Sequence, residues 1–245
     1  MKKISLLLIM LLAIACTQEE KNQYAILSGT VENNTAETVF VRGNDFEKRM
    51  PISENGTFQD TLYIKNDGFY EMYVGRERTG IYLEKGKNLS VVLDASEFDE
   101  TLKYTGDLGN INNFLAAKYL WNEQNLDYKD MFSLDETNFF QKLDNNQKSY
   151  DSLFAANQIS NENFKKKLAV EDNYSRAIML ENYAEAHRYY SGVNDFQISD
   201  NFYDELKNID YADTLAYRNS VAYQNLLDTH FNRLASAEAE KDENA

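Results

Sequence analysis

Residues 69–93, FYEMYVGRERTGIYLEKGKNLSVVL, carry the alternation of apolar and polar side chains that decides the fold of the first half of the chain. Tyr70, Met72 and Val74 fall on one face of an extended segment, because successive side chains of a strand point to opposite sides. The same alternation returns at residues 89–93. The pattern predicts half-buried β-strands separated by turns that contain glycine.

Similar short runs, rich in Val, Ile, Tyr and Thr, extend this pattern in both directions. The predicted strands are residues 24–31, 37–41, 57–64, 69–74, 80–83 and 89–93. Asn55-Gly56 predicts a type I′ hairpin turn, because both residue types tolerate a positive φ. Residues 66–68 and 85–87 supply further turns. Strands at roughly ten-residue spacing indicate an antiparallel β-sandwich or open barrel, not a parallel sheet with crossover helices.

The pattern changes near Gly106 to Gly109, where strand signals give way to apolar residues at helical spacing. Helices are predicted at Ile111, Phe114, Leu115 and Tyr119, at Phe139, Leu143, Tyr150 and Phe154, at residues 162–190, and at Tyr223, Leu226, Leu227, Phe231 and Leu234. No proline follows Pro51, so long helices can run without interruption. We therefore expect an α+β fold with an antiparallel β domain at residues 24–106 and an all-helical domain at residues 107–245.

The first sixteen residues have the features of a bacterial export signal. A basic start is followed by an apolar run from Ile4 to Ala15, and small residues precede Cys16, which is the only cysteine. The run is too short to span a bilayer and predicts a signal peptide at residues 1–15. This segment resembles a lipobox, which implies cleavage before Cys16, attachment of diacylglycerol to its sulfur and acylation of the new amine. A plain secretory signal with an incidental cysteine is the alternative.

Residues 16–23 are expected to form a solvated acidic tether between the lipid and the folded body. In lipoproteins of this kind an Asp directly after the cysteine often signals retention at the inner membrane, whereas this chain has Thr17. We therefore expect a lipid-anchored protein of the cell envelope, placed at the outer membrane. Glu19-Glu20 is similar to the start of some surface-export signals, and the leaflet stays open.

The charge balance excludes one class of partner. Removal of Lys2 and Lys3 with the signal takes the formal net charge from −15 to −17. Affinity for a phosphate backbone comes largely from Lys and Arg, so a chain this acidic is not expected to bind nucleic acid. A lipidated Cys16 leaves the mature chain without a disulfide or a thiol pair. Its contact with the membrane is expected to be the lipid itself.

Three stretches carry a resemblance to a known family: ISENGTF at residues 52–58, YLEKG at residues 82–86 and FDETLKYTG at residues 98–106. Together with the lipobox and the helices that follow, they resemble the N-terminal region of TlpA-like thiol-disulfide interchange lipoproteins of Gram-negative bacteria. In that family a β domain and a helical segment precede a thioredoxin domain. The resemblance covers nearly the whole chain, but no Cys-x-x-Cys is present, so the redox activity does not transfer to these residues.

Other chemistry has little support in the sequence, and we predict no catalytic residue, metal site or cofactor. The two histidines, His187 and His230, lie among aromatic residues at helical spacing, which favours packing roles over a triad or metal ligation. The acidic stretch from Asp94 to Asp99 lacks the ligand spacing of a calcium loop. No glycine motif that cradles a phosphate occurs.

The sequence thus leads to one expected function and two alternatives. The first is a non-catalytic envelope lipoprotein that holds a partner or substrate protein near the membrane. The second is the front part of a thiol-disulfide oxidoreductase whose thioredoxin domain lies downstream of residue 245. The third is a glycan or peptide binder with a tyrosine-lined groove, formed from Tyr183, Tyr189, Tyr190, Tyr203, Tyr211, Tyr217 and Tyr223.

Three short motifs suggest a modification. Residues 60–62, 151–153 and 213–215 each read Asp, then Ser or Thr, then Leu, which is similar to O-glycan acceptors of certain Gram-negative envelopes. Thr61, Ser152 and Thr214 are the candidate acceptor residues.

Overall fold

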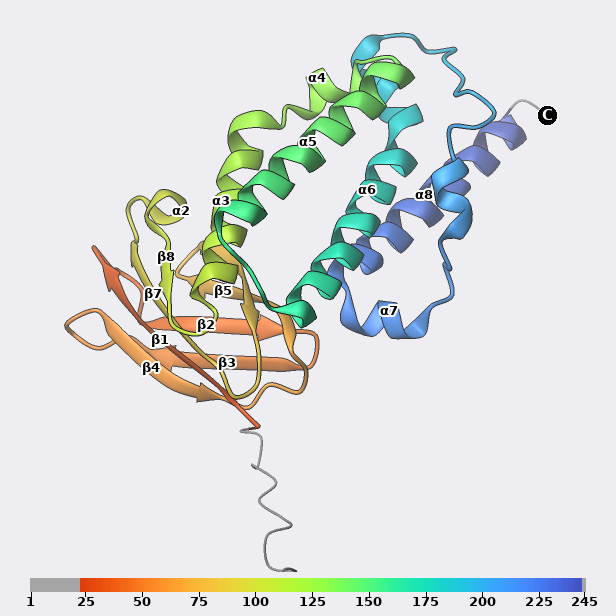
Figure 1. Cartoon of the computed structure of the whole chain (residues 1–245). Helices are drawn as coiled ribbons and strands as arrows, with labels where there is room; N and C mark the ends of the chain where they lie inside the picture. Colours follow the sequence, from red (N-terminus) through yellow and green to blue (C-terminus); the bar gives the residue numbers. More distant parts are fainter. Residues whose placement is uncertain (1–22, 244–245) are drawn as a thin grey trace, which may run out of the picture.

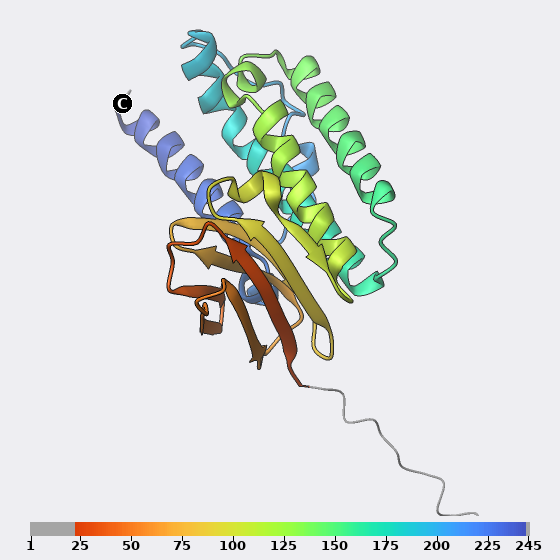
Figure 2. The ribbon, with the colours of Figure 1, turned by 90° about the vertical axis from the view of Figure 1, so that its left-hand side faces the viewer.

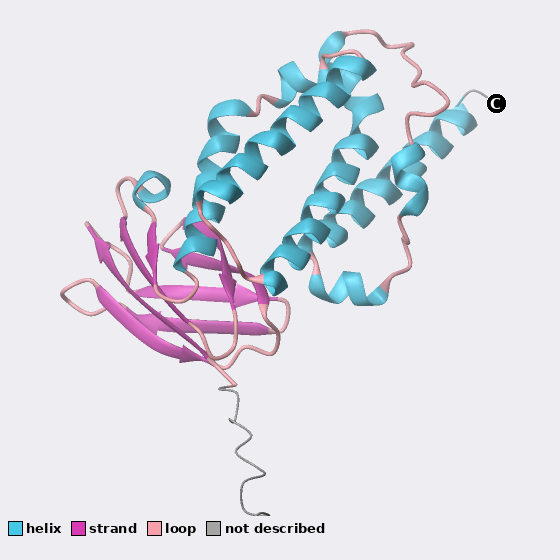
Figure 3. Cartoon of the chain, viewed as in Figure 1, coloured by secondary structure: helices cyan, strands magenta, loops and turns pink. Residues whose placement is uncertain are grey.

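The computed structural model describes residues 23–243, and in this part of the chain a β-sandwich carries the helices on one side (Figure 1). The strands lie between residues 25 and 105, and every long helix begins at or after residue 109. Figure 3 shows the strands gathered on one side of the molecule and the long helices on the other. The predicted α+β class is therefore confirmed. Of the sandwich and the open barrel that the sequence left open, the structure has a sandwich of two separate sheets.

The sandwich consists of two four-stranded sheets within the described residues. Sheet A contains, in spatial order, β4 (Thr57–Leu62), β1 (Ala25–Glu32), β7 (Asn88–Asp94) and β8 (Lys103–Thr105). Sheet B contains β3 (Phe46–Pro51), β2 (Thr38–Gly43), β5 (Gly68–Val74) and β6 (Glu77–Leu83). The alternating residues of β5 and β7 point inward and are buried, as predicted. Burial of both inner faces in one core stabilises the sandwich.

One strand pair departs from the antiparallel arrangement that the sequence led us to expect. Strands β1 and β7 run parallel, in a register from Ile26 opposite Asn88 to Glu32 opposite Asp94. The remaining pairs in the two sheets are antiparallel. Alternation identifies the buried face of a strand but carries no information about the direction of its neighbour, which explains the error.

The predicted hairpin at Asn55-Gly56 is wrong. The strands on either side of it, β3 and β4, belong to different sheets. Gly56 has a φ of +80°, but Asn55 does not have the positive φ that a type I′ turn requires. The Gly56 carbonyl accepts a hydrogen bond from Val31 N at 2.9 Å, which leads the chain into its pairing with β1. The turn therefore connects the two layers.

The structure contains two strands that sequence analysis missed. Strand β3 holds three successive charged residues, Glu47 to Arg49, and only Met50 of this strand is fully buried. It forms a hairpin with β2 through a two-residue turn at Asn44-Asp45. Strand β8 is three residues long. Charged or very short strands at sheet edges give almost no alternation signal, because little of their surface is buried.

The helical part contains one short helix near the sandwich and a group of longer helices. The helices are α2 (Phe98–Thr101), α3 (Gly109–Asn125), α4 (Tyr128–Phe132), α5 (Glu136–Ala156), α6 (Glu162–Ser191), the 3₁₀ helix η1 (Asp204–Asn208), α7 (Thr214–Asn219) and α8 (Val221–Glu243). The four predicted helical segments correspond to α3, α5, α6 and α8. Helix α6 ends at Gly192, whose φ of +74° favours glycine.

Helix α3 closes one edge of each sheet with two neighbouring asparagines. Asn112 accepts a hydrogen bond from Tyr82 N at 2.8 Å and donates to Tyr82 O at 3.1 Å, so it pairs with the edge strand β6. Asn113 makes the equivalent pair with Tyr104 of β8, at 2.8 Å in both directions. These side chains satisfy backbone groups that a sheet edge would otherwise leave unpaired. Figure 2 shows α3 lying against the sandwich.

Two hydrophobic clusters hold the molecule together. The first fills the sandwich and includes residues of the helical part, among them Phe114 and Phe164. The second lies among α4, α5, α6, η1 and α8. The division into domains at residues 24–106 and 107–245 stays a prediction, and the shared first cluster makes the two parts structurally dependent on each other.

Candidate functional site

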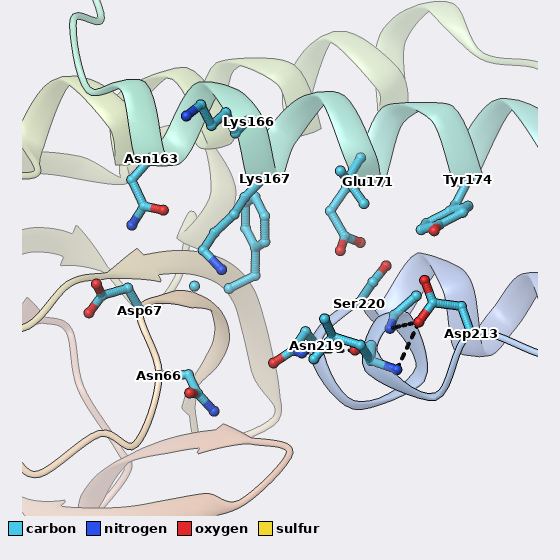
Figure 4. A pocket seen from close by; sticks show the side chains of 15 residues that line it. Asn66, Asp67, Asn163, Lys166, Lys167, Glu171, Tyr174, Asp213, Asn219 and Ser220 are labelled. Atoms are coloured by element: carbon cyan, nitrogen blue, oxygen red, sulfur yellow. Dashed lines mark hydrogen bonds between the residues drawn. The ribbon is translucent and has the colours of Figure 1, made fainter.

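An extended cavity region lies between sheet B and the helices. One cavity of about 510 Å³ is bounded by the segment before β5, by one side of α6 and by α7 (Figure 4). Its polar lining residues are Asn66, Asp67, Asn163, Lys166, Lys167, Glu171, Tyr174, Asp213, Asn219 and Ser220. Phe69, Val170, Leu215 and Ala216 add apolar surface. The mixture of amides, charges and apolar patches is typical of a binding site.

A second cavity of about 620 Å³ continues the first along sheet B. The two share the segment from Asn66 to Phe69, together with Lys167, Glu171 and Asn219. The second cavity is also lined by the β2–β3 turn and by Arg218. We call the two cavities together the interdomain groove. Both halves of the chain contribute to it.

The start of α6 fixes the wall of the groove. Asn161 caps this helix by accepting a hydrogen bond from Phe164 N at 2.9 Å, and it donates to Glu84 at 2.7 Å. Phe164 is fully buried, with its ring centre 5.0 Å from that of Tyr82. Because the first turn of α6 is anchored on the sandwich, the residues that follow on one face of the helix, from Lys166 to Tyr174, are held along the groove.

The opposite wall is the short helix α7. Asp213 caps it by accepting hydrogen bonds from Leu215 N and Ala216 N at 2.8 and 2.9 Å. Asn44 in the β2–β3 turn donates to the Arg218 carbonyl at 2.6 Å. This bond joins the end of α7 to sheet B and fixes the position of this wall on the sandwich.

Glu171 is the acidic group most affected by the groove. Burial raises its pKa, and this is partly offset by hydrogen bonds from the Ser220 hydroxyl and from Ala222 N, the latter at 3.1 Å. Lys167 lies one turn earlier on α6, and its positive charge also lowers the pKa of Glu171. The pair gives the groove one acceptor and one donor of opposite charge. Such a site can orient a polar ligand.

A second polar cluster lies inside the helical part. The Glu181 side chain on α6 is completely buried and accepts hydrogen bonds from Tyr211 at 2.7 Å, from His230 Nδ1 at 2.8 Å and from Arg233. Burial by itself raises the pKa of Glu181, but the hydrogen bonds from Arg233, Tyr211 and His230 outweigh it and hold the pKa below its ordinary value. Three donors engage the two carboxylate oxygens, so this cluster joins α6 to α8 and to the segment before α7.

The two histidines behave largely as the sequence predicted. His187 is buried, its Nδ1 lies 2.8 Å from the Phe132 carbonyl, and its ring contacts Tyr183 and Phe196. His230 stacks on Tyr211 with 3.7 Å between ring centres, at the edge of the core. Its bond to Glu181 was not predicted, because a carboxylate 49 positions away gives no sequence signal.

The predicted tyrosine-lined groove is not assembled by the structure. Tyr183 and Tyr223 are buried and hydrogen-bonded to backbone carbonyls, whereas Tyr189 is 80% exposed. Tyr211 belongs to the Glu181 cluster. None of the seven tyrosines lines the interdomain groove, which contains Tyr174 and Tyr70 instead. The abundance of tyrosines in the sequence does not show which of them are buried, and the structure divides these seven between core and solvent.

The remaining candidates have separate outcomes. Cys16 and the tether up to residue 22 lie outside the described residues, so lipidation stays a prediction. Ser152 and Thr214 are exposed, while Thr61 is half-buried in β4. In the described part of the chain, no group of three or more His, Cys, Asp or Glu side chains is arranged to hold a metal ion. None of the helices between residues 23 and 243 has the length and apolar character needed to cross a bilayer.

The fold is thus a two-sheet sandwich joined to a helical group, with a polar groove at the junction. Comparison with models of known protein families and with curated proteins finds no match to this chain. Inference about function therefore depends on the groove and on the sequence.

Proposed function

We propose that the chain is a lipid-anchored binding protein of the cell envelope, without catalytic activity of its own. In this proposal Cys16 carries the lipid, and the interdomain groove binds a segment of a partner or substrate protein. The observation that carries the proposal is the groove itself, whose walls come from both halves of the chain and whose lining combines amides, opposite charges and apolar patches. Peptide backbones require donors and acceptors of this kind.

The proposed anchor keeps the binding site near the membrane. Seven residues separate Cys16 from Tyr24, which precedes the first strand. An extended chain spans at most about 3.5 Å per residue, so Tyr24 would lie within roughly 28 Å of Cys16, at eight residue steps. A tether this short favours a protein that presents a partner at the membrane surface over one that samples a large volume.

Replacement of Cys16 by serine is expected to release the protein from the membrane fraction. Several acyl chains hold a protein almost permanently, since each buried CH₂ contributes about 0.8 kcal/mol. The measurement is detergent phase partitioning of the native and variant proteins, with the intact mass of each. Recovery of the native protein in the aqueous phase, with a thiol at Cys16 that alkylates, would contradict the proposed anchor.

A photo-crosslinking residue at Val170 is expected to give an adduct with one envelope protein of defined mass. Val170 lines the groove and is 47% exposed. The matched control is the same residue at Tyr189, further along α6 and 80% exposed. Asn219→Trp on the opposite wall should fill the groove and abolish the adduct. Equal adducts at both positions, or an adduct that survives Asn219→Trp, would exclude binding in the groove.

A second candidate is the front part of a complete thiol-disulfide oxidoreductase. It is favoured by the resemblance of residues 52–58, 82–86 and 98–106 to the TlpA-like family. The DNA that follows the codon for Ala245 distinguishes the two candidates. An in-frame Cys-x-x-Cys would support the oxidoreductase, whereas reduction of insulin by the 245-residue chain alone would contradict both proposals, because its single cysteine cannot form a thiol pair.

A further inference from the structure

The outer face of sheet B carries a row of two arginines and two aromatic rings. Strand pairing places Arg49 opposite Phe40, Phe40 opposite Tyr73, and Tyr73 opposite Arg78. Residues paired in this way share a face of the sheet. The row therefore reads Arg, Phe, Tyr, Arg across the four strands. We call these four residues the arginine–aromatic row.

Contacts order three members of the row, Arg49, Phe40 and Tyr73, whereas Arg78 pairs with Glu71 at 3.3 Å. The Arg49 guanidinium lies over the Phe40 ring at 4.2 Å from its centre, and the rings of Phe40 and Tyr73 are 5.7 Å apart. Stacking on a ring holds a guanidinium flat and leaves its N–H groups free for other partners. A cavity of about 430 Å³ lies against this part of the sheet, and Phe40, Tyr73, Arg42 and Arg49 are among its lining residues.

Within the described residues, two of the three arginines on this face have an ion-pair partner, and Arg49 has none. Glu71 pairs with Arg42 at 2.9 Å and with Arg78 at 3.3 Å. Burial by itself raises the pKa of Glu71, but hydrogen bonds from Tyr73 and Arg42 outweigh burial. The pKa of Glu71 therefore lies below its ordinary value, and the carboxylate is ionised at neutral pH. Among the described residues, no carboxylate lies within ion-pair distance of Arg49. On a protein with a formal charge of −15, this guanidinium is an exposed cation without an anion.

The remaining carboxylates on this face do not cancel the row. Glu37 lines the same cavity, and Glu47 lies on β3 opposite Arg42. The negative charge of Glu47 acts on Arg42 and raises the pKa of that arginine. Both acids are exposed, where water screens them strongly. The row itself contains two guanidinium groups and no carboxylate: Arg49 has no ion-pair partner in the described part of the chain, and Arg78 shares Glu71 with Arg42.

The spacing of the two arginines fits an extended polypeptide. Arg49 and Arg78 stand three strand spacings apart, which is roughly 14 Å at about 4.8 Å per spacing. In an extended chain, residues i and i+4 point the same way and are also roughly 14 Å apart, at about 3.4 Å per residue. The residue between them, i+2, would face the Phe40 and Tyr73 rings.

We propose that the arginine–aromatic row is a docking surface for an acidic segment of a partner protein, bound in extended form with carboxylates at positions i and i+4 and an apolar residue at i+2. Carboxylates accept paired hydrogen bonds from guanidinium groups, which gives such contacts directional specificity. Arg42 also lines the groove described above, so a partner segment that leaves the groove along sheet B would reach the row.

The test uses the full-length protein in detergent and fluorescently labelled nine-residue peptides. The probe is Gly-Ser-Glu-Thr-Leu-Thr-Glu-Ser-Gly, and its control, Gly-Ser-Glu-Thr-Leu-Glu-Thr-Ser-Gly, has the same composition with the second glutamate at i+3 on the opposite side of an extended chain. Anisotropy titration should show the first peptide binding about tenfold more tightly. Equal affinity of the two peptides, or no binding of either, would overturn the proposal.

Variants separate the row from general charge effects. Arg49→Gln combined with Arg78→Gln should weaken the first peptide about tenfold or more, whereas Lys129→Gln combined with Lys148→Gln, exposed positions on α4 and α5 with the same change of charge, should not. Arg49→Lys should also weaken it, because lysine lacks the planar fork. Preference for polygalacturonate or single-stranded DNA over the peptide would overturn the polypeptide assignment. These outcomes do not depend on crosslinking at Val170.

Discussion

Replacement of Glu181 by alanine is expected to lower the free energy of unfolding by about 3–5 kcal/mol. The Glu181 side chain is completely buried and receives hydrogen bonds from α8 and from the segment before α7. Its removal leaves Arg233 and His230 without their carboxylate, and the cost of breaking one side of a buried charged cluster falls in this range. Urea denaturation monitored by circular dichroism measures the change.

The control for this variant is Glu185→Ala, one turn further along α6 at an exposed position, which should change the free energy of unfolding by less than about 0.5 kcal/mol. The pH dependence gives a second measurement. The folded pKa of Glu181 lies below its ordinary value of 4.5, so its stabilising contribution is present above that pH and is lost as the pH falls through the folded pKa. Glu181→Gln should therefore reduce the loss of stability in acid. An unchanged acid profile would show that the cluster does not ionise as described.

Replacement of Phe164 by alanine is expected to cost about 3–5 kcal/mol, the usual range for a large aromatic removed from a core. Phe164 is fully buried, and its ring contacts Tyr82 of the sandwich and Phe114 and Phe154 of the helices. The substitution removes the side chain that joins both parts of the first hydrophobic cluster. Urea denaturation should show a lower midpoint by circular dichroism and by Trp121 fluorescence together.

Phe231→Ala is the matched control, because this ring on α8 is 57% exposed and its loss should cost less than about 1 kcal/mol. The two probes distinguish coupled from independent halves. Trp121 on α3 reports unfolding of the helical part. If Phe164→Ala lowered the midpoint measured by Trp121 fluorescence but left a second, unchanged unfolding transition by circular dichroism, the shared core would not couple the two parts. Equal effects of the two Phe variants would contradict the assigned burial of Phe164.

These two residues also explain why the groove has a fixed shape. Phe164 anchors the start of α6 on the sandwich, and Glu181 holds the same helix to α8 further along. The groove wall from Lys166 to Tyr174 lies between these two points. Because the helix is held on both sides of this wall, the wall is already ordered before a ligand binds. Binding therefore costs less conformational entropy. Variants at either residue are therefore expected to weaken ligand binding as well as stability.

The sequence determined the class of the fold because its signals are local. Alternation at residues 69–74 and 89–93 identified inward faces that are buried in the structure, and helical spacing located α6 to within one residue. Sequence analysis did not detect edge strand β3, because three successive charged residues in it give no alternation of apolar and polar side chains. The interdomain groove was not detected either, because its walls come from residues about 100 to 150 positions apart, such as Asn66, Lys167 and Asn219.

What the sequence alone determined is the order of strands and helices, the faces they bury, the acidic charge and the single cysteine at Cys16. Only the tertiary structure decided that β1 and β7 run parallel, that Asn112 and Asn113 close the two sheet edges, and that Glu181 meets His230 and Arg233. The physical reason is the range of the forces involved. Burial of an apolar face leaves a periodic record in neighbouring residues, whereas a hydrogen bond between distant segments depends on how the whole chain packs.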